Sequence, residues 1–203
     1  MRFGYWLVQS FVKVILIIFW GLRIHNKKNL PKTGAVIVAS NHISFIDPPV
    51  IGVSIFREAT FAAKKELFQN FILGSIITYL NSIPVRRTGF DNEALKYFIK
   101  ALKKEQVLIM FPEGTRSRIG TMLPFKRGVG YMVAKTGATV LPTYIIGTDK
   151  LKKRLFRPGG ITVRFGVPMF DLAGKYDGEE SYELIAQDVQ KAVEKLKAEA
   201  EAK

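Results

Sequence analysis

The chain has 203 residues, with 31 lysines and arginines against 17 aspartates and glutamates, two histidines and no cysteine. This length fits one domain with a substantial core, and the missing cysteines exclude a disulfide framework, a thiol nucleophile and a thiolate metal site. The net charge of +14 favours polyanionic partners, which include nucleic acid, an anionic membrane surface and phosphorylated substrates.

The first 22 residues are aromatic and aliphatic almost throughout, and the basic run 23–28 follows them. Lys13 lies near the middle of this segment, and its uninterrupted apolar run, 14–22, is shorter than the about 20 residues that span a bilayer. We therefore expect a helix embedded in one leaflet, with both tryptophans near the headgroups and the basic run facing anionic lipid. Two alternatives stay open: a secretory signal, although no small-residue cleavage site follows, and a helix buried in the core.

We predict a membrane anchor with its basic flank over 1–29 and one α/β domain over 30–203, because short β-rich runs alternate with helical ones after residue 34. The continuous apolar run 106–111 is typical of a sheet covered on both faces, so we expect a mostly parallel central sheet flanked by helices. The expected strands are 34–40, 60–63, 82–86, 106–111, 140–146 and 161–167. The expected helices are 48–56, 67–80, 91–105, 126–137 and 179–202. Pro142 predicts that strand 140–146 lies at an edge or contains a bulge.

One of the two histidines, His42, comes directly after strand 34–40, and Asp47 follows it five residues later. A carboxylate that holds one imidazole nitrogen leaves the other facing the substrate as a general base. On a regular helix the two side chains would point about 140° apart, so the pair requires a loop, which Pro48 and Pro49 favour. The alternative is that Asp47 is only a helix N-cap and His42 an ordinary loop residue.

The loop 111–118 follows another expected strand and gathers one acid, one glycine, two hydroxyl residues and two arginines. Arginine binds phosphate oxygens bidentately and glycine lets backbone N–H groups approach, so the loop suits an oxyanion or phosphate. A solvated turn with an internal Glu–Arg pair is the alternative. The later segment 150–157 mixes cations with leucine and phenylalanine, which suits a membrane interface and an ordinary basic loop equally well.

Four blocks in this order resemble the glycerolipid acyltransferase family, most closely its 1-acyl-glycerol-3-phosphate acyltransferases. They are Asn-His-x4-Asp at 41–47, Asn-Ser-Ile-Pro-Val-Arg-Arg at 81–87, Phe-Pro-Glu-Gly-Thr-Arg-Ser at 111–117 with Pro-Phe-Lys-x-Gly at 124–128, and Val-Leu-Pro at 140–142. In the second block Asn81 replaces the family's usual glycine and the motif arginine aligns with Arg87. Which of Arg86 and Arg87 faces the ligand stays open.

The resemblance implies a single acyltransferase domain that transfers a fatty acyl group from acyl-CoA or acyl carrier protein to the sn-2 hydroxyl of lysophosphatidic acid, 1-acyl-glycerol-3-phosphate. The product would be phosphatidic acid, in phospholipid biosynthesis. His42, oriented by Asp47, would take the hydroxyl proton without an acyl-enzyme, in keeping with the absent cysteine. The implied substrate-binding residues are Asn41, Arg86, Arg87, Glu113, Gly114, Thr115, Arg116 and Lys126. We expect no metal or other cofactor, and a monotopic position on the cytoplasmic face of a membrane.

Other functions compete with this interpretation. An anionic phospholipid-binding module without catalysis would use the basic clusters and the N-terminal helix, but it leaves the Asn-His-x4-Asp spacing unexplained. An acyltransferase that acts on another lysophospholipid is also open. The chain has no Gly-x-Ser-x-Gly elbow of a serine hydrolase. The motif loops carry too few cations interleaved with aromatic residues for us to predict a nucleic-acid partner.

Overall fold

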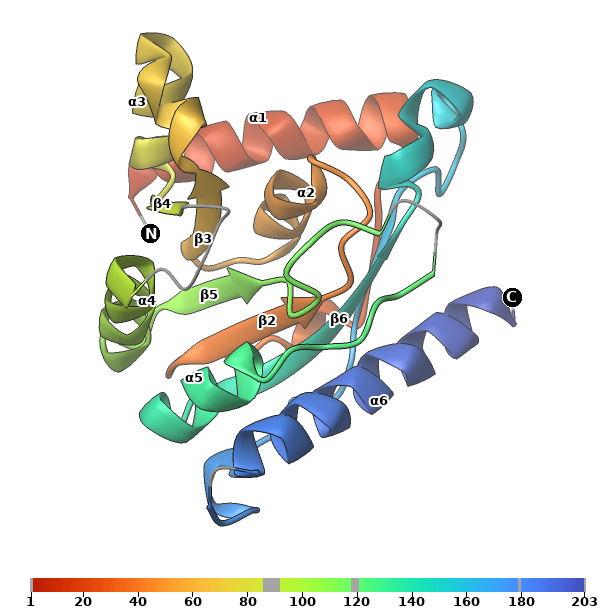
Figure 1. The fold of residues 1–203 in the computed structure, drawn as a ribbon. Helices are drawn as coiled ribbons and strands as arrows, with labels where there is room; N and C mark the ends of the chain where they lie inside the picture. Colours follow the sequence, from red (N-terminus) through yellow and green to blue (C-terminus); the bar gives the residue numbers. More distant parts are fainter. Residues whose placement is uncertain (1, 86–91, 118–120, 179, 203) are drawn as a thin grey trace.

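The computed structural model describes residues 2–85, 92–117, 121–178 and 180–202, which form one sheet with helices on both faces (Figure 1). The strands are β1 Arg23–His25, β2 Val36–Ser40, β3 Ala59–Lys64, β4 Ser82–Val85, β5 Val107–Met110, β6 Thr139–Ile146 and β7 Thr162–Phe165. The α-helices are α1 Phe3–Trp20, α2 Asp47–Ser54, α3 Phe71–Tyr79, α4 Asn92–Lys103, α5 Gly128–Thr136 and α6 Ser181–Glu201. Short 3₁₀ helices are η1 Lys27–Asn29, η2 Lys65–Gln69, η3 Thr148–Arg154 and η4 Leu172–Gly174.

The strands lie in the order β1-β7-β6-β2-β5-β3-β4, and every neighbouring pair is parallel except β6 with β7. The expected α/β fold with a mostly parallel sheet is therefore confirmed. β2 lies between β5 and β6, and all five of its residues are buried. The carboxyl ends of these three parallel strands meet at one edge of the sheet, which is where open α/β sheets place their ligands.

Alternate residues of β2 enter two separate hydrophobic clusters, as the two-residue period of a strand requires. Val36 and Val38 pack in the cluster that also contains Leu16 of α1 and Val50 and Ile51 of α2. The other cluster combines the remaining β2 side chains with those of α4, α5 and α6, and its members include Ile37, Ala39, Leu102, Met132, Val133, Ile185 and Val189. The sheet is therefore covered on both faces, and this explains the continuous apolar runs of its strands.

Pro142 lies in β6 between β2 and β7 and not at an edge, so of the two expected positions only the bulge remains. β6 pairs with β7 as far as Thr143 and Phe165, and the next antiparallel bridge joins Val140 to Met169. One more residue therefore lies on the β7 side than on the β6 side, which is a β-bulge. The missing N–H of proline falls where the ladder is already irregular.

The N-terminal helix packs on the domain along one side, so the expected helix does have a partner in the protein. Its buried residues are Tyr5, Gln9 and Leu16. The Gln9 amide donates hydrogen bonds to the carbonyl oxygens of Gly52 (2.7 Å) and Ile55 (3.1 Å). Only 17% of this helix is buried, although it is long and apolar enough to cross a membrane. The opposite side of α1 is apolar and exposed, which differs from a helix buried in the core.

The basic flank of the helix also belongs to the sheet. Arg23–His25 forms β1 and pairs in parallel with β7, a strand that the sequence did not predict. The division at residue 29 stays a prediction, but the residues on its N-terminal side contribute an edge strand to the domain that follows. The expected helix 67–80 is divided into η2 and α3, whose outward side chains include the exposed Phe71 and Ile72.

Candidate active site

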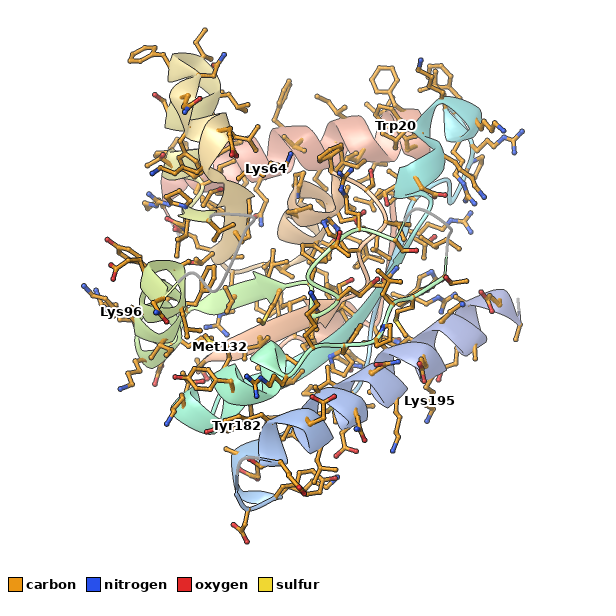
Figure 2. The ribbon with its side chains drawn as sticks, in the orientation of Figure 1. Trp20, Lys64, Lys96, Met132, Tyr182 and Lys195 are labelled. Atoms are coloured by element: carbon orange, nitrogen blue, oxygen red, sulfur yellow. The ribbon has the colours of Figure 1, made fainter. Side chains whose placement is uncertain are left out.

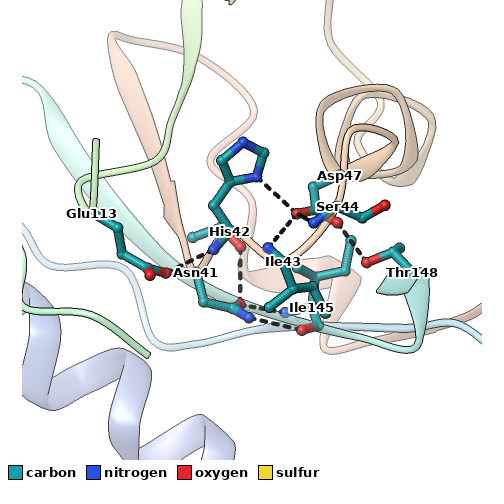
Figure 3. Close-up of polar contacts among 9 residues, drawn as sticks. Asn41, His42, Ile43, Ser44, Asp47, Glu113, Ile145 and Thr148 are labelled. Atoms are coloured by element: carbon teal, nitrogen blue, oxygen red, sulfur yellow. Dashed lines mark hydrogen bonds and ion pairs between the residues drawn. The ribbon is translucent and has the colours of Figure 1, made fainter. Parts of the chain in front are cut away.

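His42 and Asp47 form the pair that their spacing predicts (Figure 3). The chain leaves β2 after Ser40, curls back and enters α2 at Asp47, so that Nδ1 of His42 lies 2.8 Å from Oδ2 of Asp47. The aspartate side chain is completely buried, and the imidazole is 18% exposed. The loop therefore places a buried carboxylate behind a histidine that solvent can reach.

Each oxygen of the Asp47 carboxylate accepts further hydrogen bonds. Oδ2 accepts from the backbone N–H groups of Ile43 and Ser44, both at 2.7 Å. Oδ1 accepts from the hydroxyl of Thr148 at 2.5 Å. A buried charge is costly unless hydrogen bonds compensate for its lost hydration, and these donors supply that compensation. They also hold the carboxylate in the one orientation that faces His42.

Thr148 is the first residue of η3 and lies 101 residues from Asp47 in the chain. Its contact with Asp47 was not predicted from the sequence. One signal was available. Thr148 follows β6, and β6 runs parallel to β2, so the residues after both strands meet at the same edge of the sheet. The hydroxyl is buried with the carboxylate that it holds.

The imidazole of His42 is oriented on two sides. A carboxylate accepts hydrogen bonds, so Nδ1 carries the proton and Nε2 is left as the acceptor. Phe111 stacks against the ring with centroids 4.1 Å apart and an interplanar angle of 25°. Across the described parts of the chain, no protein group hydrogen-bonds to Nε2. This nitrogen is therefore available to accept a proton from a substrate.

Glu113 corrects a predicted role, because it is buried and clamps backbone groups. Its Oε1 accepts from the backbone N–H of His42 at 2.7 Å, and its Oε2 accepts from that of Leu123 at 3.0 Å. Burial raises the pKa of this carboxyl, while the hydrogen bonds from Leu123 and His42 oppose that shift. A buried carboxylate whose two oxygens already accept from the backbone is not placed to bind a phosphate, which it would repel. Glu113 instead joins the loop 111–117 to the His42 backbone.

Asn41 is also placed for support and not for the predicted substrate contact. Its amide nitrogen donates to the carbonyl of Ile145 at 2.9 Å, and its amide oxygen accepts from the N–H of the same residue at 2.8 Å. The side chain is buried and imitates a backbone group, so it continues the pairing of β2 with β6 beyond the end of β2. His42 begins its loop from this fixed point.

Cations gather beside Phe45, in the loop between His42 and Asp47, and beside the loop 111–117, and we call this group the cationic side of the pair. The Arg116 guanidinium stacks over the ring of Phe45, with its central carbon 3.4 Å from the ring centroid. The ammonium of Lys64, which the sequence did not single out, lies 5.5 Å from the same centroid. Phe45 is 65% exposed and Thr115 is exposed as well, so this group of side chains faces solvent. A cation held by an aromatic ring keeps its N–H groups free for an anion.

Gly114 and Lys126 form the other part of this cationic side. Gly114 has a φ of +69°, and a Cβ built on it would lie 2.9 Å from the ammonium nitrogen of Lys126. Glycine is therefore needed both for the backbone conformation and for the space that the lysine occupies. The backbone N–H of Lys126 donates to Pro112 at 2.9 Å, which fixes the lysine beside the loop 111–117.

Arg86 and Arg87 lie outside the described residues, so their predicted contact with the acceptor stays a prediction. Among the described residues, no group of three or more histidine, cysteine, aspartate or glutamate side chains is placed to hold a metal ion. The structure thus brings together His42 and Asp47 with Asn41 and Glu113 behind them. It places Gly114, Thr115, Arg116 and Lys126 along one neighbouring loop region.

Comparison with known proteins agrees with this arrangement. The Acyltransferase family model matches residues 21–146. The chain is 33% identical over 159 residues to a 1-acyl-sn-glycerol-3-phosphate acyltransferase of Bacillus subtilis (strain 168), with 78% of each chain covered. It is 27% identical over 205 residues to a Borreliella burgdorferi protein of the same name, covering 97% of this chain and 81% of that one. The matches to relatives in Arabidopsis thaliana, Brassica napus and Cocos nucifera span 43%, 44% and 45% of the length of those longer proteins.

The crystal structure of the 1-acyl-sn-glycerophosphate (LPA) acyltransferase, PlsC, from Thermotoga maritima has the same fold. It superposes with a TM-score of 0.76 and 31% sequence identity, over 96% of this chain and 80% of that chain. The family match covers more than half of the chain and includes both His42 and Asp47 and the whole loop 111–117. The chain belongs to the acyltransferase family.

Proposed function

We propose that the protein transfers a fatty acyl group from an acyl thioester to the sn-2 hydroxyl of 1-acyl-glycerol-3-phosphate and releases phosphatidic acid and a free thiol. The observation that carries this proposal is the His42–Asp47 pair, in which the buried carboxylate holds Nδ1 and leaves Nε2 open. The names of the Bacillus and Borreliella relatives and of the Thermotoga structure support the choice of acceptor. A module that only binds phospholipid would not need a buried carboxylate behind a histidine.

In the proposed reaction, Nε2 of His42 accepts the proton of the sn-2 hydroxyl while the hydroxyl oxygen attacks the thioester carbonyl. Asp47 stays ionised and stabilises the imidazolium that forms. When the tetrahedral intermediate collapses, the C–S bond breaks and the departing sulfur takes the proton from Nε2. The acyl group passes directly to the acceptor, so no enzyme nucleophile is needed.

The acceptor phosphate fits the cationic side of the pair. Arg116 of the loop 111–117 lies over Phe45, the Lys126 side chain lies against Gly114 of that loop, and Lys64 adds a third charge beside Phe45. Charge-assisted hydrogen bonds to phosphate are among the stronger polar interactions of proteins. We add Arg87 to this set from the motif alone. The proposed acceptor is therefore a lysophospholipid with an exposed phosphomonoester, and a neutral monoacylglycerol should be a poor substitute.

The proposed location is the cytoplasmic face of a membrane, with α1 lying in one leaflet and its exposed apolar side toward the lipid. α1 is the support for this, because its outward side carries large apolar residues that the domain does not cover. Acyl-CoA and acyl carrier protein are both open as donors.

The test combines purified protein with lysophosphatidate and a panel of acyl-CoA and acyl carrier protein thioesters, with the lipid products resolved by mass spectrometry. Phosphatidate from at least one donor is the expected result, with His42→Ala as the inactive control. A product formed only from lysophosphatidylcholine or lysophosphatidylglycerol would show that the acceptor is a different lysophospholipid. Lipid binding without any acylated product would show that the protein is a binding module and not an enzyme.

A further inference from the structure

A cationic cavity lies at the C-terminal end of α1, and its lining residues include neither His42 nor Asp47. It measures about 290 Å³ and is lined by Lys150, Lys153, Arg154, Arg157, Pro158, Gly159 and Gly160. We call these residues the basic pocket. They belong to η3 and to the turn before β7, the teal and blue segment beside the end of α1 in Figure 1. Figure 2 labels Trp20 at this end of the helix.

Backbone hydrogen bonds fasten the basic pocket to α1. The N–H of Gly159 donates to the carbonyl of Gly21 (3.0 Å), and the N–H of Phe156 donates to that of Phe19 (2.6 Å). The indole N–H of Trp20 donates to the Leu151 carbonyl in η3 at 3.0 Å. A Cβ on Gly21, which has a φ of +57°, would lie 2.6 Å from a carbonyl oxygen of the pocket. The pocket therefore has a fixed position relative to the helix that we assign to the membrane.

Among the described residues, few charges of the basic pocket are balanced by carboxylates. Arg23 adds a fifth cation, because its guanidinium carbon lies 3.5 Å from a Cβ built on Gly159. The nearest ion pair in the segment is a long one, 3.9 Å between Lys150 and Asp149. In the part of the chain that the structure describes, Lys153 and Arg157 have no carboxylate partner. Like charges held together in this way repel one another, and a bound anion relieves the repulsion.

The surroundings of the basic pocket indicate which anion this is. Leu155 and Phe156 are 43% and 66% exposed at its rim, and the Phe156 ring contacts that of Phe19 with centroids 5.5 Å apart. These side chains continue the exposed apolar side of α1. A lipid phosphate in the pocket would therefore have its acyl chains beside apolar protein. The volume lies at the lower end of the about 300 to 1,000 Å³ typical of small-molecule pockets, which is enough for a phosphate headgroup.

We propose that the basic pocket binds the phosphate of an anionic phospholipid in the leaflet that α1 enters. This rests on the proposed membrane contact of α1 and adds a defined headgroup site to it. The site matters for the chemistry because η3 also contains Thr148, whose hydroxyl holds Asp47. One short segment thus joins the lipid site to the catalytic pair and sets the orientation of that pair relative to the bilayer.

The test compares two charge-matched variants. Lys153→Gln/Arg157→Gln removes two cations of the basic pocket, and Lys191→Gln/Lys195→Gln removes two exposed cations of α6, on the other face of the sheet (Figure 2). Binding is measured by flotation with phosphatidylcholine vesicles, with and without phosphatidylglycerol. Each cation near an anionic surface is worth about fivefold, so the pocket variant should bind anionic vesicles roughly 30-fold more weakly. Its binding to neutral vesicles should not change, and the α6 variant should stay close to wild type.

Three results would overturn the proposal. Equal losses in both variants would mean that the attraction is a diffuse effect of net charge. Wild-type binding that ignores phosphatidylglycerol would mean that the pocket binds no lipid phosphate. A pocket variant with normal vesicle binding and a raised KM for acyl-CoA or acyl carrier protein would assign the pocket to the donor. The acyltransferase assay on lysophosphatidate in neutral micelles separates this proposal from the proposed function. Both variants should be equally active in that assay. A wild-type protein without activity there would contradict only the proposed function.

Discussion

The loop that carries His42 and Asp47 buries and bonds its polar side chains, whereas α1 and η3 leave large apolar and basic side chains exposed on the outward side of the molecule. In the loop, Asp47 and the His42 backbone are held by groups from η3 and the loop 111–117. On the outward side, α1 and η3 expose phenylalanine, isoleucine and basic side chains. Proton transfer needs a geometry that is fixed before the substrate arrives. An exposed apolar surface of this kind is complete only when a membrane or a partner covers it.

The strongest test of this contrast removes the pair itself. His42→Ala should lower turnover about 10²- to 10⁴-fold, as loss of a general base does, and Asp47→Ala should be nearly as damaging. The double variant should be little worse than the worse single one, because residues that act as a unit are not additive. Steady-state kinetics on protein shown to be folded by circular dichroism provides the measurement. Near wild-type activity in His42→Ala would end the enzymatic proposal.

The outward side is tested by making α1 polar without unfolding it. From the sequence alone, deletion of residues 1–22 should release the protein from the membrane and leave the pair intact. The structure argues against deletion, because Leu16 and Gln9 pack against the domain. Phe11→Ser/Ile18→Ser is a sharper change, since these side chains are 68% and 59% exposed.

Burial of each such side chain in lipid is worth about 1.5 to 3 kcal/mol, so the double variant should partition into neutral vesicles at least about 100-fold more weakly. Its melting temperature should stay near that of wild type. Leu16→Ser is the matched control, which should lower the melting temperature because Leu16 is buried. High salt alone should not release the intact protein, since apolar burial is not screened. Release by salt would assign the attachment mainly to charge.

Substitutions on the cationic side of the pair should have a smaller effect, and only on the KM for lysophosphatidate. Arg116→Ala should raise the apparent KM for lysophosphatidate on the order of tenfold or more, and leave the KM for the acyl donor nearly unchanged. Arg116→Lys keeps the charge but loses the planar guanidinium, so its KM for lysophosphatidate should lie between those of wild type and Arg116→Ala. Arg87→Ala should act in the same direction. Equal changes in both KM values would give Arg116 a structural role.

Local patterns of the sequence were enough for the architecture. Apolar runs between turn residues located the strands from 36 to 165, and the parallel sheet followed from their alternation with helices. The His42–Asp47 spacing, with two prolines that favour a loop before α2, predicted the pair but left open that Asp47 is only a helix N-cap. These features depend on residues that are close together in the chain, so local sequence patterns can predict them.

The supporting residues could not be assigned in the same way. Asn41 and Glu113 were predicted to bind substrate, yet their side chains bond to backbone groups of Ile145, His42 and Leu123. Motif membership identifies such residues as important but does not distinguish a ligand contact from a clamp. That distinction depends on the register between strands far apart in sequence, as do the pairing of β1 with β7 and the contact of Thr148 with Asp47.

The smallest expected effect comes from Thr148, and it tests whether the hydrogen bonds that order the loop contribute to turnover. Thr148→Val keeps the shape and removes the hydroxyl, so one oxygen of Asp47 loses its donor while His42, Ile43 and Ser44 remain bonded to the other. Loss of one such hydrogen bond of about 1 kcal/mol should lower turnover roughly fivefold, with both KM values unchanged. Thr148→Ser keeps the donor and should restore most of the rate.

The serine variant separates this positioning role from a general loss of packing, because Thr148→Ser loses the methyl group and keeps the donor to Asp47. A Thr148→Ser variant as slow as Thr148→Val would show that the side chain supports the fold and that its hydroxyl does not position the pair.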